Sequence, residues 1–200
     1  MKNIVITFSG KARSGKDTSV QFVKKYFEEQ GMNVFCLAYA DYLKALCRRN
    51  FGYDDADKEH QRKILQKFGT DVVREIDDIF WVETVFNTVD VLREAYDVFL
   101  ISDARYENEL RPYPWTLGYA VFNTLVRRKE DNGLSDAERS HSSEALAESE
   151  DTSKFHFLID NNEGLEELDG ICKELVDFIL KAKKQAEENM DVEGAAVGDK

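Results

Sequence analysis

Short apolar runs alternate along the chain with longer stretches of helical period. The apolar runs are rich in β-branched and aromatic residues, which is typical of buried strands. They predict strands at 2–8, 33–37, 97–102, 119–126 and 155–160. The amphipathic stretches between them predict helices at 16–30, 41–50, most of 58–95 with a break near Gly69, and 164–184. Strands that alternate with helices predict an α/β fold with three α/β/α layers, in which a five-stranded parallel sheet is covered on both faces.

Three segments depart from this alternation. Residues 106–117 have a helix-like composition, which Pro112 and Pro114 must break or end. Residues 127–144 are polar, contain a glycine and carry basic groups at both ends, as a mobile lid would, with a simple surface loop as the alternative. From 185 to 200 the composition turns to Glu, Gly, Ala and Asp, which predicts a flexible acidic tail after a single domain at 1–184.

Composition and charge limit the partners of this domain. The 200 residues include 39 acidic and 27 basic side chains, a net charge of -12, which argues against polynucleotide binding. No apolar run approaches the roughly 18–20 residues that a membrane helix needs. The three cysteines form no CxxC pair, so we expect reduced thiols and no disulfide framework. We therefore expect a cytoplasmic protein that binds small molecules, and the sequence leaves a homodimer open.

The strongest chemical signal is the segment 10–18, GKARSGKDT, which fits the pattern G-x-x-x-x-G-K between a strand and a helix. In such a loop the backbone N–H groups and the helix N-terminus hold phosphates, and the lysine reaches the β- and γ-phosphates. Asp17 stands where a Ser or Thr is usual, and Thr18 follows it, so both are candidates to hold Mg²⁺ directly or through water. The loop residues expected to bind ATP are Gly10, Arg13, Ser14, Gly15, Lys16, Asp17 and Thr18. An ordinary glycine-rich turn is the alternative interpretation.

Charged residues also follow the third predicted strand. Asp103 ends this strand, where phosphate-loop proteins place an acid near Mg²⁺, and Arg105 follows two residues later. A helix N-cap is the alternative role for Asp103. Because phosphoryl transfer needs negative charge to be neutralised, further cations should converge on this edge. The candidates are Arg13, Lys44, Arg62, Arg74, Arg127, Arg128 and Arg139.

Six segments, in the same order along residues 3–180, resemble the deoxynucleoside monophosphate kinases of phages and bacteria. They are FSGKARSGKDT, LAYADYLKAL, RKILQKFGTDVVREIDDIFWV, FLISDARYENEL, SHSSEAL and LIDNNEGLEEL. The resemblance implies a P-loop nucleoside-monophosphate-kinase-like fold. It also implies direct in-line transfer of a phosphoryl group from ATP, with Mg²⁺, to a (deoxy)nucleoside 5′-monophosphate. The acceptor would bind within about residues 39–95, under the lid at 127–144.

The resemblance also assigns roles to individual residues. The catalytic set is Lys16, Arg105 and Asp103, to which Arg127 is added for its place at the end of the fourth predicted strand, and Asn161 is expected at the ATP base. Asp103 joins Asp17 and Thr18 as a metal candidate. The acceptor-binding set is Lys44, Arg62, Gly69, Thr70, Asp71, Arg74, Trp81 and Glu144. The apolar helical pattern alone favours a core side chain for Trp81.

The sequence is also compatible with other functions. Phosphomevalonate kinase of the animal type has a similar loop and strand end, and dephospho-coenzyme A kinase is a more distant rival. A protein that holds ATP without transferring phosphate belongs to a different class, of binding modules. A signalling GTPase is disfavoured, because residues 160–163, DNNE, lack the lysine of the guanine motif N-K-x-D.

Overall fold

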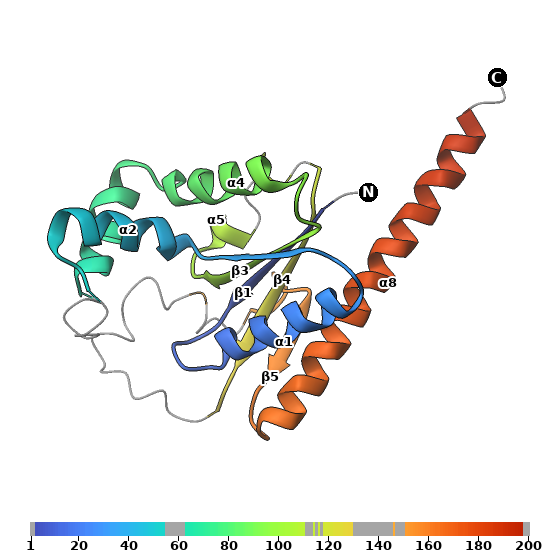
Figure 1. The fold of residues 1–200 in the computed structure, drawn as a ribbon, viewed down its shortest axis with the longest axis horizontal. Helices are drawn as coiled ribbons and strands as arrows, with labels where there is room; N and C mark the ends of the chain where they lie inside the picture. Colours follow the sequence, from blue (N-terminus) through green and yellow to red (C-terminus); the bar gives the residue numbers. More distant parts are fainter. Residues whose placement is uncertain are drawn as a thin grey trace.

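One parallel sheet organises the computed structural model, which describes residues 3–54, 63–110, 114, 116, 118–129, 146 and 151–197. In these ranges the strands are β1 (Ile4–Ser9), β2 (Val34–Leu37), β3 (Val98–Ala104), β4 (Ala120–Arg127) and β5 (Phe157–Asp160). They lie in the order β2-β3-β1-β4-β5, and every neighbouring pair is parallel (Figure 1). The predicted five-stranded parallel sheet is therefore confirmed.

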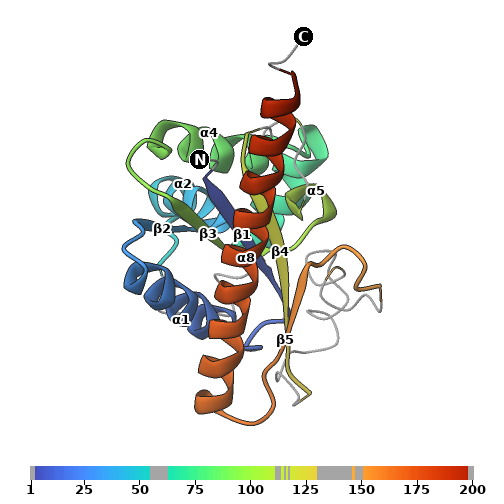
Figure 2. The ribbon, with the colours of Figure 1, turned by 90° about the vertical axis from the view of Figure 1, so that its right-hand side faces the viewer.

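Helices cover both faces of this sheet (Figure 2). Ile4, Ile6 and Phe8 of β1 pack in one buried cluster with α1 (Lys16–Glu29) and α8 (Leu165–Val197). Val5, between them in sequence, packs in a second cluster with α2 (Tyr39–Phe51) and α4 (Phe80–Leu92). Successive residues of a strand point to opposite faces, so a fully apolar strand builds both cores at once. The three-layer arrangement is confirmed.

The strand order reverses around the central strand β1: the chain passes from β1 through α1 to β2 on one side of it, and later from β3 to β4 on the other side. Such a switch point opens a crevice beyond the strand ends, and ligands of open α/β sheets bind there. The loops that follow β1 and β3 and the N-terminus of α2 all lie at the carboxyl edge of the sheet.

The helical region between β2 and β3 differs from its prediction. Residues 63–66 are helical and continue directly into η1 (Lys67–Arg74), a π-helix, so the chain does not break at Gly69. The break falls at 77–79 instead. Gly69 serves close packing, because a Cβ there would lie 2.5 Å from Leu43 Cδ2. Wide turns of this kind inside helices are often found at functional sites.

Two further elements test the predicted boundaries. Among the described residues of 106–117, the chain forms the short helix α5 (Glu107–Leu110), which lies before Pro112. The last helix does not end at 184, however: α8 continues to Val197 and extends beyond the sheet (Figure 1). The residues from 181 to 188, KAKKQAEE, are strong helix formers, which explains the continuation. None of the helices in the described ranges combines the length and apolar composition that crossing a bilayer requires.

Candidate active site

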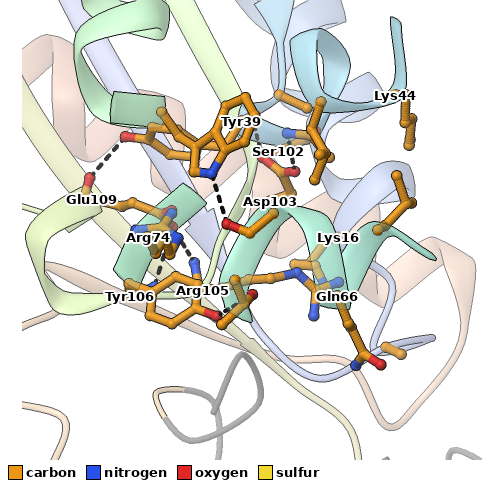
Figure 3. Close-up of a pocket in the computed structure, with 18 of the residues that line it drawn as sticks. Lys16, Tyr39, Lys44, Gln66, Arg74, Ser102, Asp103, Arg105, Tyr106 and Glu109 are labelled. Atoms are coloured by element: carbon orange, nitrogen blue, oxygen red, sulfur yellow. Dashed lines mark hydrogen bonds and ion pairs between the residues drawn. The ribbon is translucent and has the colours of Figure 1, made fainter. Parts of the chain in front are cut away.

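A cavity of about 410 Å³ lies at the carboxyl edge of the sheet (Figure 3). Its walls come from the loop after β1, the start of α2, η1, the start of α4 and the segment that follows β3. Ten residues proposed from the sequence line it: Arg13, Lys16, Asp17, Lys44, Gly69, Thr70, Arg74, Trp81, Asp103 and Arg105. Residues from four distant parts of the chain thus meet in one space of the size of small-molecule sites.

The cavity is cationic although the chain as a whole is acidic. Its described lining includes the basic side chains Arg13, Lys16, Lys44, Arg74 and Arg105, against the acidic Asp17, Asp103 and Glu109. Figure 3 shows Lys16 and Lys44 toward one end and Arg74 and Glu109 toward the other, with Arg105 between. A local positive potential of this kind attracts phosphorylated molecules.

The phosphate loop joins β1 to α1 in a tight turn. Gly10 has φ +149, and a Cβ there would lie 2.3 Å from the Val126 backbone oxygen. Arg13 has φ 63, in the left-handed region that few side chains adopt. Lys16, at the first residue of α1, donates from Nζ to the carbonyl oxygens of Gly10 at 2.6 Å and Lys11 at 2.7 Å. The lysine therefore lies folded over the loop, at the point where the helix N-terminus adds positive charge.

Asn161, which follows β5, binds this loop on the side away from the cavity. Its side-chain amide donates to the Ser14 carbonyl oxygen at 2.9 Å in a buried contact. Gly15 passes beneath the same amide: it has φ +103, and a Cβ there would lie 2.3 Å from Asn161 Nδ2. The backbone amide of Asn161 donates to the Arg127 carbonyl oxygen at 2.8 Å. Asn161 thus holds the shape of the loop, a contact that the sequence does not reveal.

Asp103 lies under the N-terminus of α2. Its two carboxylate oxygens accept the backbone N–H groups of Tyr39 at 2.7 Å and Ala40 at 3.0 Å. Burial raises the pKa of Asp103, while these N–H groups and Arg105 oppose the shift. The carboxylate therefore caps a helix, as the alternative interpretation proposed, but the helix is α2 rather than the one that follows its own strand.

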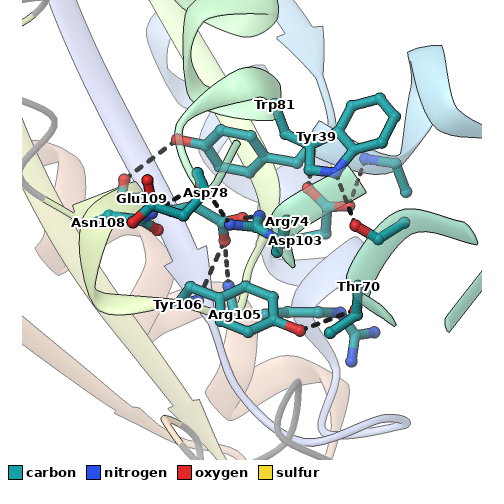
Figure 4. Close-up of polar contacts among 12 residues, drawn as sticks. Tyr39, Thr70, Arg74, Asp78, Trp81, Asp103, Arg105, Tyr106, Asn108 and Glu109 are labelled. Carbon is teal, nitrogen blue, oxygen red and sulfur yellow. Dashed lines mark hydrogen bonds and ion pairs between the residues drawn. The ribbon is translucent and has the colours of Figure 1, made fainter. Parts of the chain in front are cut away.

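A buried ion pair closes the other end of the cavity (Figure 4). Arg74, from η1, binds the Glu109 carboxylate of α5, and its guanidinium carbon lies 3.9 Å from the centre of the Tyr106 ring. Glu109 also accepts the backbone N–H groups of Arg105 at 2.6 Å and Tyr106 at 3.1 Å. Burial raises the pKa of Glu109 to about 7, although Arg74 and the two N–H groups favour its charged form.

Aromatic and hydroxyl groups line the same end. Trp81 is buried, and its indole N–H donates to the Gly69 carbonyl oxygen at 3.0 Å, so it belongs to the core and to the cavity wall together. The hydroxyls of Tyr106 and Thr70 share a hydrogen bond of 3.0 Å. Tyr39 donates its buried hydroxyl to the Glu109 backbone oxygen at 3.1 Å. Flat rings beside fixed polar groups suit a planar ligand such as a nucleobase.

Sequence reasoning missed several of these lining residues. Tyr39, Gln66, Tyr106 and Glu109 had no assigned role, although all line the cavity. The one local signal was the spacing of Arg105 and Glu109, four residues apart on a helix-like segment.

Other predicted residues do not line the cavity. Gly10, Ser14, Gly15 and Asn161 form or support the phosphate loop behind it, and Thr18 lies in the first turn of α1. Asp71 is exposed on η1. Arg127 ends β4 at the same edge of the sheet. Arg62, Arg139 and Glu144 lie outside the described residues, as does the predicted lid from 130 onward, so their roles stay predictions.

The donors near the loop fit a magnesium ion that is partly held by phosphate. Among the described residues, no three His, Cys, Asp or Glu side chains come together as a metal cage. Mg²⁺ usually takes one or two carboxylates and completes its shell with water and substrate phosphates. Asp17 lines the cavity beside Lys16 and can supply such an oxygen, whereas both Asp103 oxygens already accept α2 N–H groups.

A G-x-x-x-x-G-K loop between the first strand and first helix of a parallel sheet, with a cationic cavity beside it, defines a P-loop protein of the kinase type. The chain belongs to the deoxynucleotide monophosphate kinase family, whose family model matches residues 38–171. The family resemblance seen in the sequence is therefore confirmed, and the chain is a phosphotransferase of the nucleotide kinase kind. The matched range begins after the phosphate loop and includes the acceptor-side segments.

Comparisons with other proteins bear on the fold. No curated protein matches the chain. A presumed kinase from Chloroflexus aurantiacus is similar in structure with a TM-score of 0.51 at 13% identity, over 90% of this chain and 98% of that chain. The Mycobacterium tuberculosis APS kinase, as a Cys556Ala mutant, has a TM-score of 0.49 at 14% identity, over 90% and 98%. The Campylobacter jejuni dephospho-CoA kinase has 0.48 at 11%, over 89% and 97%. The first likeness supports the fold and does not identify the substrate.

Proposed function

We propose that this protein transfers the γ-phosphoryl group of ATP to a (deoxy)nucleoside 5′-monophosphate. The observation that carries the proposal is that the phosphate loop and an aromatic acceptor-side wall face one cavity. Lys16 and Arg13 line the cavity from the phosphate loop, and Trp81 and Tyr106 line it from the aromatic wall. In-line transfer requires both phosphates in one such space.

The phosphate loop would hold the donor. Its backbone N–H groups and the start of α1 would bind the β- and γ-phosphates, and Lys16 would exchange its two loop carbonyls for phosphate oxygens. Mg²⁺, when bound, would neutralise charge on the phosphates, with Asp17 as the candidate carboxylate and Thr18 as the candidate hydroxyl.

Arg105 and Lys44 would hold the acceptor phosphate. Both line the cavity, and Arg105 lies between the loop end and the aromatic end. The nucleoside would extend toward Trp81, Tyr106 and Leu43. No general base is required in this mechanism, because the attacking phosphate oxygen is already anionic. The chain's contribution is to position the phosphates and to neutralise charge.

The aromatic wall favours a nucleotide over phosphomevalonate, one of the two competing acceptors. A phosphomevalonate is a small branched chain with no flat ring, so Trp81 and the Tyr106 ring would have little to stack against. The non-catalytic alternative would not require a second group of cations, but Lys44 and Arg105 line the cavity apart from the phosphate loop.

ADP release from ATP and Mg²⁺ tests the proposal. The acceptor panel holds each common ribo- and deoxyribonucleoside monophosphate, phosphomevalonate and dephospho-coenzyme A, and Lys16→Met is the control for contaminating kinases. We expect Lys16-dependent turnover with one or more nucleoside monophosphates. Turnover only with another acceptor contradicts the substrate class. ATP binding without turnover across the panel supports the binding module instead.

A further inference from the structure

Glu109 is a buried carboxylate whose hydrogen-bonding capacity is used within the protein. The residue is 1% exposed. One oxygen binds Arg74, and the other accepts the N–H groups of Arg105 and Tyr106 at 2.6 and 3.1 Å. A carboxylate with all these partners is poorly placed to bind substrate or to take a proton from it. Its contacts instead connect three elements around the cavity: η1, the end of β3 and α5.

The first consequence concerns Arg74. Its guanidinium binds Glu109, donates to the Asp78 carbonyl oxygen at 3.1 Å and stacks 3.9 Å from the Tyr106 ring centre (Figure 4). Because Tyr106 is itself held through its hydroxyl by Thr70 at 3.0 Å, the arginine and the ring form a rigid wall. This wall depends on the charge of Glu109, since a neutral carboxyl group attracts the guanidinium far less.

The second consequence concerns Arg105, whose side chain lines the cavity between its two ends. Glu109 holds the backbone nitrogen of Arg105, from which the position of the whole side chain follows. Misplacement of a charge-neutralising group by about 1 Å can lower a reaction rate by roughly 100-fold.

We propose that Glu109 is a positioning residue for phosphoryl transfer, which in its ionised form holds the Arg105 backbone and the Arg74–Tyr106 wall, and whose protonation releases Arg74. This inference rests on the proposed function, because it assigns a role within the same reaction. Glu109 acts through its neighbours and touches neither phosphate.

The charged surroundings of Glu109 set the pH range in which this release occurs. Arg74 faces it from η1, Asp103 from β3, Tyr39 from α2, and Arg105 and Tyr106 from its own segment. Arg74 and the backbone N–H groups favour the ionised form, whereas burial and Asp103 oppose it, and burial dominates. With a pKa of about 7, Glu109 changes charge within the range of an ordinary kinase assay.

The main test is Glu109→Gln in the full chain, with Glu107→Gln as the matched control. Glutamine keeps an oxygen for the two backbone N–H groups but turns an N–H₂ donor toward Arg74. Glu107 lies on the same short helix, is exposed and forms a surface ion pair with Lys154. At pH 8 we expect Glu109→Gln to lower kcat about 10- to 100-fold with the KM for ATP within about twofold. The control should match the wild type in both.

The pH profile separates positioning from a purely structural role. The wild-type kcat should fall below about pH 7 as Glu109 takes up a proton. That limb should be absent from Glu109→Gln. A second limb near pH 6, from the phosphate of the acceptor itself, should remain in both proteins. A structural role would lower the melting temperature and leave the shape of the profile unchanged.

A double-mutant cycle with Arg74→Met completes the test. If Glu109 acts on Arg74, the double variant should be no slower than the slower single variant. The double variant also removes Arg74, which Glu109→Gln alone would leave buried without its carboxylate partner. It therefore remains informative if Glu109→Gln alone fails to fold. The proposal would be overturned if a folded Glu109→Gln had the wild-type kcat. It would also be overturned if kcat of Glu109→Gln still fell below about pH 7, or if the kcat losses of the two single variants added in the double variant. Absence of wild-type turnover with every nucleoside monophosphate would instead refute the proposed function.

Discussion

Gly15→Ala should destabilise the protein far more than an ordinary glycine substitution. Gly15 has φ +103, so alanine there carries a backbone cost of about 1–2 kcal/mol. The new Cβ would also lie 2.3 Å from Asn161 Nδ2, which must move and lose its hydrogen bond to the Ser14 carbonyl oxygen. A buried oxygen left without a donor costs about 1–3 kcal/mol more. The total is about 2–5 kcal/mol.

Gly31→Ala is the matched control for the backbone term. Gly31 also has a positive φ, of +76, but a Cβ there would meet nothing within 4 Å. Its substitution should therefore cost only the backbone term, about 1–2 kcal/mol, or a melting temperature lower by roughly 2–8 °C in a chain of this size. The difference between the two variants isolates the contact with Asn161.

Urea denaturation and ATP binding measure both effects. Asn161→Ala removes the crowding partner, so the double variant with Gly15→Ala should lose less stability than the sum of the single variants. Gly15→Ala should also weaken ATP binding, because the loop carbonyl that Asn161 holds would shift. Equal stability losses in Gly15→Ala and Gly31→Ala would refute the reasoning, since they would show that the loop accommodates the Cβ freely.

Three further outcomes follow from the contacts around the cavity. Gly69→Ala should push the Leu43 side chain, 2.5 Å from the new Cβ, into the cavity, and steady-state kinetics should show a higher KM for the acceptor with the KM for ATP unchanged. Trp81→Phe removes the indole N–H that donates to the Gly69 carbonyl oxygen, together with part of a buried ring, and should lower the free energy of unfolding by about 1–3 kcal/mol in urea denaturation. Because the folded-state pKa of Glu109, about 7, lies above its ordinary value of 4.5, the native state binds the proton more tightly than the unfolded state. Stability should therefore fall by about 2–4 kcal/mol as the pH rises from 4.5 to 7, and this part of the pH dependence should be absent from Glu109→Gln; identical pH curves for the two proteins would contradict it.

The phosphate loop could be predicted from the sequence because its chemistry is local. Its glycines, Lys16 and the flanking strand and helix are consecutive, so one pattern specifies both fold and ligand. The strands were predictable for a related reason, since burial on both faces leaves continuous apolar runs. The family segments added Gly69, Thr70 and Trp81, which the structure brings to the cavity.

The contacts of Glu109 could not be predicted in the same way. Its partner Arg74 lies 35 residues earlier, and an acid in a short helix with Glu107 and Asn108 is ordinarily a solvated group. Tyr39 and Asp103 pose the same difficulty, because their hydrogen bond joins positions 64 residues apart. Local sequence patterns predict which helices and strands form, whereas such polar contacts depend on how those elements pack against one another.

The predicted end of the last helix, at 184, was wrong for a different reason. The turn to Glu, Gly, Ala and Asp after 184 suggested loss of structure, but the lysines, glutamates and alanines at 181–188 favour a helix more strongly than the later glycines oppose it. Composition and helix propensity gave opposite indications there, and propensity prevailed.

The most direct measurement of the central claim is where the γ-phosphoryl group goes. A single turnover with γ-labelled ATP, Mg²⁺ and the best acceptor of the panel should place the label on the β-position of the nucleoside diphosphate. Lys16→Met should leave it on ATP. Label that appears as inorganic phosphate, with the acceptor unchanged, would contradict transfer between two nucleotides in this cavity.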